Sequence, residues 1–240
     1  MKHIVLFSGG CASSYAAYLV IQEYGRKDTI LLHTPTFSEH PDADRFRCQV
    51  ARYLKMPITV WGDGRNIWQI IEDNNCLPSQ FIPFCTRQLK QRMKEEFYRT
   101  LDDEFIEYIG FGMDEWPRVQ KAIARAEAEG RKVRFPLFEQ KISNWKVKQI
   151  IQNEWKIELP SVYKYLDHNN CIPCFKAGKK SWKAYYKHYP EQFQKAVEME
   201  KAIGHTVFKD KSLEELAIEW ANDSCQIDLF ETTPCECWSA

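Results

Sequence analysis

The chain has 240 residues with 33 basic and 33 acidic side chains, so its formal net charge is zero. This length allows one domain with an appendage or two small domains, and the balanced charge gives no overall case for a nucleic-acid or membrane-surface protein. No stretch approaches the roughly 20 apolar residues that span a bilayer, so we expect no membrane partner.

The first predicted element is a buried strand over residues 4–7, an apolar Ile-Val-Leu-Phe run, and a helical pattern follows over residues 14–24. Between them lies the turn Ser8-Gly9-Gly10-Cys11-Ala12-Ser13-Ser14. The two glycines let the backbone approach an anion closely, and the three serines add hydroxyl groups. Because a helix N-terminus carries partial positive charge, the sequence predicts a phosphate-binding loop here.

Further strands and helices alternate along the first half of the chain. Strands are predicted over residues 28–34, 58–61, 105–109 and 133–135, and helices over residues 42–54, 86–100, 117–129 and 144–153. This alternation predicts an α/β fold with a doubly wound, mostly parallel sheet, whose ligand site lies beyond the carboxyl ends of the strands. His33 and Thr34 end the second strand and Gly112 follows the fourth, so we expect them near the nucleotide.

The pattern becomes helical without strands beyond this half. We predict a nucleotide-binding domain over residues 1–137 and a helical, cysteine-containing region over residues 138–240. Arg87 and Lys90 stand one and four residues into the helix that follows Cys85. They are candidates for holding a phosphate or sulfate, or they belong to a solvated helix face.

Nine cysteines in a chain expected to be cytoplasmic call for metal, redox or burial explanations, because disulfides are rare there. Cys171 and Cys174 form a Cys-x-x-Cys pair, a spacing that suits a 4Fe-4S cluster, zinc or a redox dithiol. Cys85 and the terminal pair Cys235 and Cys237 are the candidates to complete a metal site, Cys235 first of the pair. Cys235 and Cys237 alternatively act as a nucleophile and its resolving partner, or belong to an exposed tail. His168 is either a loop hydrogen-bonder or a general acid or base.

The order of these motifs resembles a known family. Ser-Gly-Gly-x-x-Ser is followed by Cys85-Thr-Arg-x-Leu-Lys, then Gly-x-x-Asp/Glu-x-x-Arg around residues 110–118, His-Asn-Asn-Cys-x-x-Cys-x-Lys-Ala-Gly from His168, and a terminal Cys-x-Cys. This order is similar to the phosphoadenosine phosphosulfate (PAPS) reductase-like family of bacteria and phages, in the adenine nucleotide alpha hydrolase or PP-loop ATP pyrophosphatase superfamily. The resemblance implies that Ser8, Gly9, Gly10 and Ser13 bind ATP or a related adenine nucleotide.

Three functions fit the resemblance. The first is cleavage of ATP to AMP and pyrophosphate, which activates a substrate for sulfur or nitrogen transfer with an iron–sulfur cluster, with Ser13, Arg87 and Lys90 stabilising the phosphates. The second is reduction of PAPS or adenylyl sulfate by Cys235 or Cys237. The third is a nucleotide-binding module without catalysis, since Ala12 stands where ATP pyrophosphatases usually carry Asp.

The partners expected from these readings are a nucleotide and either RNA or a small sulfur acceptor. A basic and aromatic segment, Lys176 to Lys187 with Trp182, is a candidate surface for an anionic substrate or an ordinary lysine-rich face. A second copy of the chain is a further candidate partner. A magnesium ion would depend on carboxylates such as Asp42, Asp44 or Asp114.

Overall fold

The computed structural model describes residues 1–222 and contains one five-stranded sheet in that part of the chain. Its strands are β1 (Lys2–Leu6), β2 (Thr29–His33), β3 (Ile58–Val60), β4 (Phe105–Tyr108) and β5 (Lys132–Arg134). They are ordered β3-β2-β1-β4-β5, and every neighbouring pair is parallel. The predicted doubly wound α/β fold is therefore confirmed.

The central strand β1 is buried on both faces, as its unbroken apolar sequence requires. Val5 packs into a core shared with Leu31 of β2, while Ile4 packs into a second core shared with Leu32. Side chains alternate between the two faces of a strand, so each strand contributes to both cores. Both faces consequently need a layer of helices.

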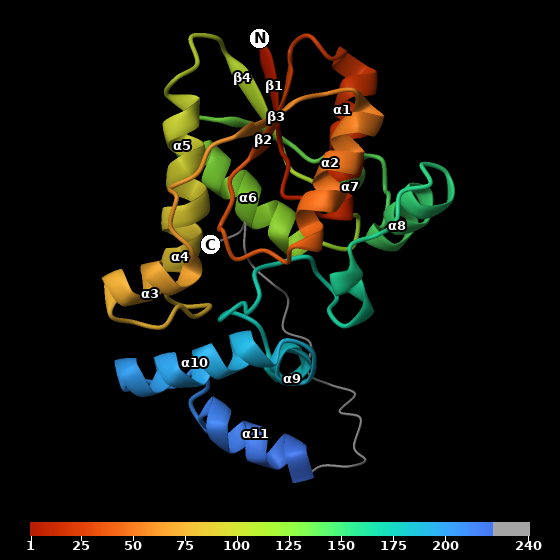
Figure 1. The fold of residues 1–240 in the computed structure, drawn as a ribbon. Coiled ribbons are helices and arrows are strands. Elements are labelled where there is room, and N and C mark those ends of the chain that lie inside the picture. The colour runs from red at the N-terminus through yellow and green to blue at the C-terminus, as the bar shows by residue number, and fades with distance from the viewer. Residues whose placement is uncertain (223–240) are drawn as a thin grey trace.

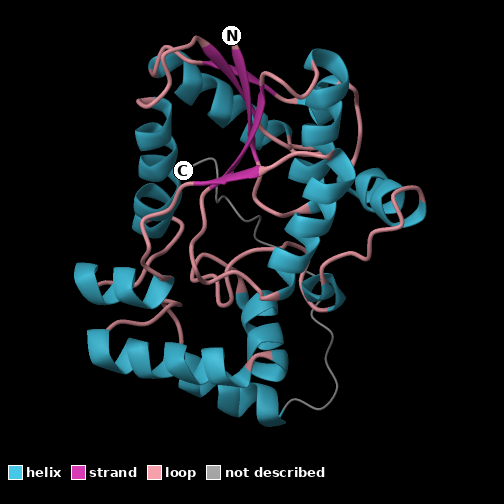
Figure 2. Ribbon diagram, turned by 45° about the horizontal axis from the view of Figure 1, so that its top comes forward, coloured by secondary structure: helices cyan, strands magenta, loops and turns pink. Residues whose placement is uncertain are grey.

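Helices cover the two faces as the chain winds back and forth (Figure 1). One layer contains α1 (Cys11–Tyr24), α2 (Asp42–Leu54), α7 (Pro136–Glu139) and α8 (Asn144–Asn153). The other contains α5 (Arg92–Tyr98) and α6 (Trp116–Ala128). Figure 2 shows the parallel strands between these layers.

A third core lies below the sheet and contains helices and loops but no strand of the sheet. It combines α9 (Lys179–His188), α10 (Pro190–Ile203) and α11 (Leu213–Asn222) with the 3₁₀ turn η2 (Ser161–Lys164) and with α3 (Ile67–Asn74) and α4 (Phe84–Thr86). Trp182 and Tyr185 are almost completely buried in it. Segments from both halves of the sequence thus share this core (Figure 1).

Three details differ from the sequence-based expectations or add to them. Helix α3 was not predicted, and α8, which we assigned to the helical region, packs against α1 with Val147 and Ile151 in the sheet-side core. The predicted helix after Cys85 contains a π-helical segment, η1 (Arg87–Gln91), between α4 and α5. Among residues 1–222, no helix is both long and apolar enough to cross a membrane.

Candidate functional site

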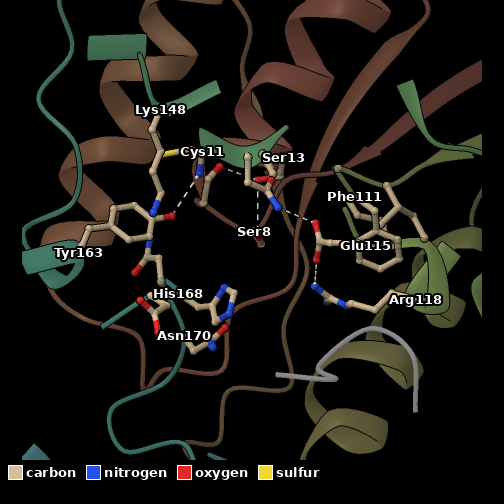
Figure 3. Close-up of a pocket in the computed structure, with 18 residues that line it drawn as sticks. Ser8, Cys11, Ser13, Phe111, Glu115, Arg118, Lys148, Tyr163, His168 and Asn170 are labelled. Carbon is tan, nitrogen blue, oxygen red and sulfur yellow. Dashed lines mark hydrogen bonds and ion pairs between the residues drawn. The ribbon is translucent and has the colours of Figure 1, made fainter. Parts of the chain in front are cut away.

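A pocket of about 150 Å³ opens beyond the carboxyl ends of β1 and β4 (Figure 3). The chain passes from β1 to β2 on one side and returns to β4 on the other, so the pocket lies at the topological switch point where such sheets bind ligands. We call it the switch-point pocket. Its walls come from the loops after β1 and β4, the first turns of α1 and α8, and residues 163–170.

The loop after β1 depends on its glycines. Gly9 has a φ of +85°, which side-chain-bearing residues rarely adopt, and a Cβ there would lie 2.7 Å from Cγ of Arg47. The carbonyl of Gly9 accepts a hydrogen bond of 2.8 Å from Nδ2 of Asn169. The loop therefore packs against Arg47 of α2 and is bonded to Asn169, in the segment that precedes the Cys-x-x-Cys pair.

The three serines of the loop have different roles. Ser8 and Ser13 line the pocket, with their hydroxyl oxygens 3.1 Å apart, and the Ser13 hydroxyl also donates to the carbonyl of Gly10 at 2.9 Å. The Ser14 hydroxyl donates to the carbonyl of Gly10 at 2.9 Å and is fully buried, so it stabilises the turn. Gly10 precedes α1 without a side-chain cap. Because the first amides of a helix have no partner inside it, the N-terminus of α1 presents N–H groups and partial positive charge beside this pocket.

The opposite wall is organised by Glu115, which follows β4. Its Oε2 accepts hydrogen bonds from the Gly112 amide at 2.9 Å and from Nδ2 of Asn144 at 2.8 Å, and its Oε1 pairs with Arg118. The Arg118 guanidinium lies 4.3 Å from the centre of the Phe111 ring. Glu115 thus holds Arg118 and Asn144 against the pocket, whereas Gly112, predicted to contact nucleotide, has its amide committed to Glu115.

The third wall carries a cation that the sequence analysis missed. Nζ of Lys148, from α8, lies 4.2 Å from the centre of the Tyr163 ring, and within residues 1–222 no carboxylate lies within ion-pair distance of it. The Tyr163 hydroxyl accepts a 3.4 Å hydrogen bond from the Cys11 amide, at the start of α1. Burial raises the pKa of the Cys11 thiol to about 11, so the thiol is neutral. Lys148 therefore supplies positive charge beside α1 (Figure 3).

His168 also lines the switch-point pocket. Burial, helped by the Arg118 charge, lowers its pKa below the ordinary value of 6.5. The imidazole is consequently neutral at pH 7. The position of His168 is compatible with both predicted roles, a hydrogen-bonding residue of the loop and a general acid or base.

A smaller cavity of about 40 Å³ adjoins the first and shares Ser8, Asn169 and Asn170 with it. Its other lining residues are His33, Thr34, Glu39, Lys90 and Cys171. We call it the His33 cavity. It brings together four of the residues singled out from the sequence, His33, Thr34, Lys90 and Cys171, which come from three distant segments of the chain.

Lys90 reaches this cavity from the π-helical segment η1, and π-helical turns are frequent at functional sites. Arg87, at the start of the same segment, is exposed and is not among the lining residues of either cavity. The two basic residues that the sequence placed on neighbouring faces are thus separated, and only Lys90 lies in the candidate site.

The cysteines are the candidate metal ligands. The short helix α4, which carries Cys85, and the loop that carries Cys174 are adjacent, because Nζ of buried Lys176 donates to Oγ1 of Thr86 at 3.1 Å. Cys171 lies 3.0 Å from Oγ1 of Thr36 through its sulfur. Within residues 1–222, however, no group of three or more His, Cys, Asp or Glu side chains is arranged to hold a metal ion. The described residues alone do not make a ligand set, and Cys235 and Cys237 lie outside them, so the 4Fe-4S cluster stays a prediction.

The carboxylates proposed for magnesium have other positions. Asp42 binds Arg45 and accepts from the Ser161 amide, Asp44 pairs with Arg47, and Asp114 is exposed. None of the three lines the switch-point pocket, whose carboxylates are Glu115 and Asp167.

Unpartnered polar atoms concentrate in the two cavities. Among the described residues, five buried side-chain nitrogen or oxygen atoms have no hydrogen-bond partner. Four of them belong to cavity-lining residues: Nε2 of His33, Nε of Arg118, Oδ1 of Asn144 and Oδ1 of Asn169. Leaving such a group unpaired costs about 1–3 kcal/mol, so these atoms indicate a place where a ligand completes the bonding.

In comparisons with known proteins, no family model matches the chain and a search of curated proteins finds no match. Of the predicted nucleotide-binding residues, Ser8, Gly10 and Ser13 line the switch-point pocket and His33 and Thr34 line the His33 cavity. Gly9, Ser14 and Gly112 shape the surrounding backbone instead. Function must therefore be inferred from the chemistry of these two cavities.

Proposed function

We propose that this protein binds ATP or a related adenine nucleotide by its phosphates in the switch-point pocket and cleaves ATP between the α and β phosphates to activate an acceptor oxygen. One observation carries the proposal: the N-terminus of α1, which Gly10 does not cap, the hydroxyls of Ser8 and Ser13 and the ammonium of Lys148 meet in one pocket at the switch point of a parallel sheet. Helix N-termini and ammonium groups together favour phosphate oxygens.

The size of the pocket supports a phosphate end. At about 150 Å³ it is smaller than the 300–1,000 Å³ of pockets that enclose a whole drug-sized ligand. Two linked phosphates therefore suit it, with the rest of the nucleotide extending along the edge of the sheet. Both carboxylates that line the pocket are paired with other cations, Glu115 with Arg118 and Asp167 with Lys180, so neither neutralises Lys148.

In the proposed reaction, an oxygen of the acceptor attacks the α-phosphorus of ATP. The bond from that phosphorus to the bridging oxygen breaks, and pyrophosphate leaves with the bonding electrons. Preorganised donors lower the barrier where negative charge develops, which here is beside α1, Ser13 and Lys148. The acceptor then carries AMP on its oxygen, and a sulfur or nitrogen nucleophile releases AMP by replacing that oxygen.

The other readings have less support among the described residues. Reduction of PAPS depends on Cys235 and Cys237, which lie outside residues 1–222. The iron–sulfur cluster remains an expectation from the resemblance, and no step is assigned to it. RNA and small sulfur acceptors remain the candidate second substrates, and a cytoplasmic location and self-association remain expectations as well.

The first test is calorimetric binding of ATP and of inorganic pyrophosphate to the full-length protein and to Lys148→Met. Loss of a charge-assisted contact predicts affinity that is roughly 10- to 100-fold weaker for both ligands. Lys146→Met is the matched control, because Lys146 lies on the same helix, is exposed and does not line the pocket. It should bind as the unaltered protein does.

The second test is release of pyrophosphate from ATP in the presence of RNA or small carbonyl acceptors. The proposal requires AMP and pyrophosphate in equal amounts, with release slowed in Lys148→Met and unchanged in Lys146→Met. Failure to bind either ATP or pyrophosphate would refute the binding site. Binding without pyrophosphate release would refute the reaction and favour the module without catalysis.

A further inference from the structure

The His33 cavity differs in hydrogen-bonding character from the switch-point pocket. His33 is 5% exposed and ends β2, and its Nδ1 lies 3.1 Å from the carbonyl oxygen of Phe7. A carbonyl can only accept, so Nδ1 carries the ring proton and donates it to Phe7. Nε2 of the neutral ring is then a lone-pair acceptor, and it has no partner among the described residues.

The neutral state of the ring has an independent cause. Burial, reinforced by the nearby Arg47 charge, lowers the pKa of His33 to about 4. The imidazole therefore stays neutral at physiological pH. An unpaired acceptor in this position suits a ligand group that donates a hydrogen bond.

Asn169 provides a second hydrogen-bond acceptor without a partner among the described residues. Nδ2 of Asn169 donates to the Gly9 carbonyl at 2.8 Å, which fixes the orientation of the amide. Its Oδ1 has no partner within residues 1–222. The Glu39 carboxylate, by contrast, already accepts from the amides of Thr36 and Ser38. His33 and Asn169 thus present two unused acceptors to a cavity of about 40 Å³.

Two acceptors do not favour phosphate, whose oxygens are themselves acceptors at neutral pH. They match a small group with two adjacent donors. In a nucleotide whose phosphates occupy the neighbouring pocket, the ribose is the part joined directly to the phosphates, and the cavities share Ser8, Asn169 and Asn170. In dinucleotide-binding sheets, an acceptor roughly 20 residues after the glycine loop binds a ribose hydroxyl, and His33 has a similar spacing from Gly10.

We propose that His33 Nε2 and Asn169 Oδ1 accept hydrogen bonds from the ribose hydroxyls of the bound nucleotide, so that the His33 cavity selects ribonucleotides. This inference rests on the proposed phosphate site. It assigns His33 a role in ligand selection, with the Phe7 carbonyl as the group that fixes its tautomer.

The test compares calorimetric binding of ATP, 2′-deoxy-ATP, 3′-deoxy-ATP and inosine triphosphate, with pyrophosphate as the reference ligand. One lost hydrogen bond predicts affinity about two- to twelve-fold weaker for a deoxy analogue than for ATP. Inosine triphosphate, which lacks the adenine amino group and keeps both hydroxyls, should bind as ATP does. Substitutions at His33 should leave the affinity for pyrophosphate unchanged.

Two variants separate the two sides of the ring. His33→Asn places an amide nitrogen near the Nδ1 position, retains a donor for Phe7 and removes the Nε2 acceptor. His33→Gln places an amide near the Nε2 position and can restore an acceptor. We expect His33→Asn to lose discrimination against one of the two deoxy analogues and to keep it against the analogue that lacks the hydroxyl bound by Asn169. His33→Gln should recover part of the lost discrimination.

A spectroscopic measurement covers the case in which neither variant folds. In ¹⁵N-labelled protein, the Nε2 resonance of His33 should have the shift of an unprotonated nitrogen and should move on addition of ATP more than on addition of the deoxy analogue. Equal binding of ATP and both deoxy analogues, discrimination against both analogues that is unchanged in His33→Asn, or a loss with inosine triphosphate alone would each overturn the inference while leaving the phosphate site intact. Absence of ATP and pyrophosphate binding would instead overturn the proposed function and this inference together.

Discussion

Gly110 is the residue at which the two halves of the switch-point pocket touch. It follows β4 and packs against the first turn of α1. A Cβ at this position would lie 2.6 Å from the carbonyl carbon of Ala12, 2.7 Å from its oxygen and 2.7 Å from the amide nitrogen of Ser13. Ordinary contacts begin at 3.4 Å, so the shortfall is 3.4 − 2.6 = 0.8 Å against backbone atoms.

The substitution Gly110→Ala must therefore displace the start of α1 or the end of β4. Overpacking of this kind costs about 1–3 kcal/mol, and we expect the free energy of unfolding to fall by that amount. Urea unfolding followed by circular dichroism measures it. Because the displaced atoms belong to the loop that we propose binds phosphate, affinity for pyrophosphate should also fall.

Gly10→Ala is the matched control for stability. Gly10 has a φ of −90° and a ψ of 161°, which any residue adopts, and a Cβ there would lie 3.7 Å from its nearest neighbours, on Ser8 and Tyr163. We expect a change of less than about 1 kcal/mol in its free energy of unfolding. If Gly110→Ala were as stable as Gly10→Ala, the close approach of β4 and α1 would be wrong.

Three further predictions concern buried or site-lining charges. Burial and the Arg47 charge lower the pKa of His33 from 6.5 to about 4 in the folded protein. Between these values the unfolded chain binds the extra proton. The free energy of unfolding is therefore highest above about pH 6.5 and falls by about 3 kcal/mol as the pH drops to 4. Unfolding measured from pH 4 to 8 should be flatter in His33→Asn, and an identical slope would contradict this. Glu107→Leu should lower the free energy of unfolding, measured by heat or urea, by about 3–5 kcal/mol. The reason is that buried Lys94, whose Nζ lies 3.1 Å from Glu107, loses its carboxylate partner. A smaller decrease would mean that the pair is hydrated. Lys90→Ala should weaken ATP binding measured by calorimetry while Arg87→Ala should not, and equal effects would argue against the orientation set by η1.

The sheet could be predicted because its signals are local. Each long strand is an apolar run that ends at a polar or glycine-containing turn, as in β1 with Ser8 after it, and burial on both faces requires such a run. The loop after β1 could be singled out for the same reason. Its glycines and serines are contiguous, and their effect depends on the backbone of the loop itself.

The missed elements had weaker or non-local signals. Helix α3 begins with a capping box between Asn66 and Gln69, a pattern visible in the sequence that was overlooked. The π-helical turn at η1 could not be read from periodicity, because one extra residue in a turn rotates Arg87 and Lys90 relative to each other without changing the composition. Lys148 and Tyr163 had no motif that linked them to the loop.

The remaining part of the site depends on tertiary packing. The region beyond residue 137 looks purely helical, yet α8 returns to the sheet-side core and brings Lys148 to the start of α1. Asn169 reaches Gly9 across 160 residues of sequence. Such contacts follow from how layers stack, which a single sequence does not encode in any short window.

The bond between Asn169 and Gly9 has a consequence for the order in which the molecule matures during synthesis. A nascent chain that ends before residue 160 already contains all five strands but lacks Tyr163 and Asn169. In such an intermediate on the ribosome, the loop after β1 would lack its contact with Asn169. The nucleotide affinity that we propose would then emerge only when the later segment leaves the exit tunnel. Ligand capture would then report that translation has passed this point.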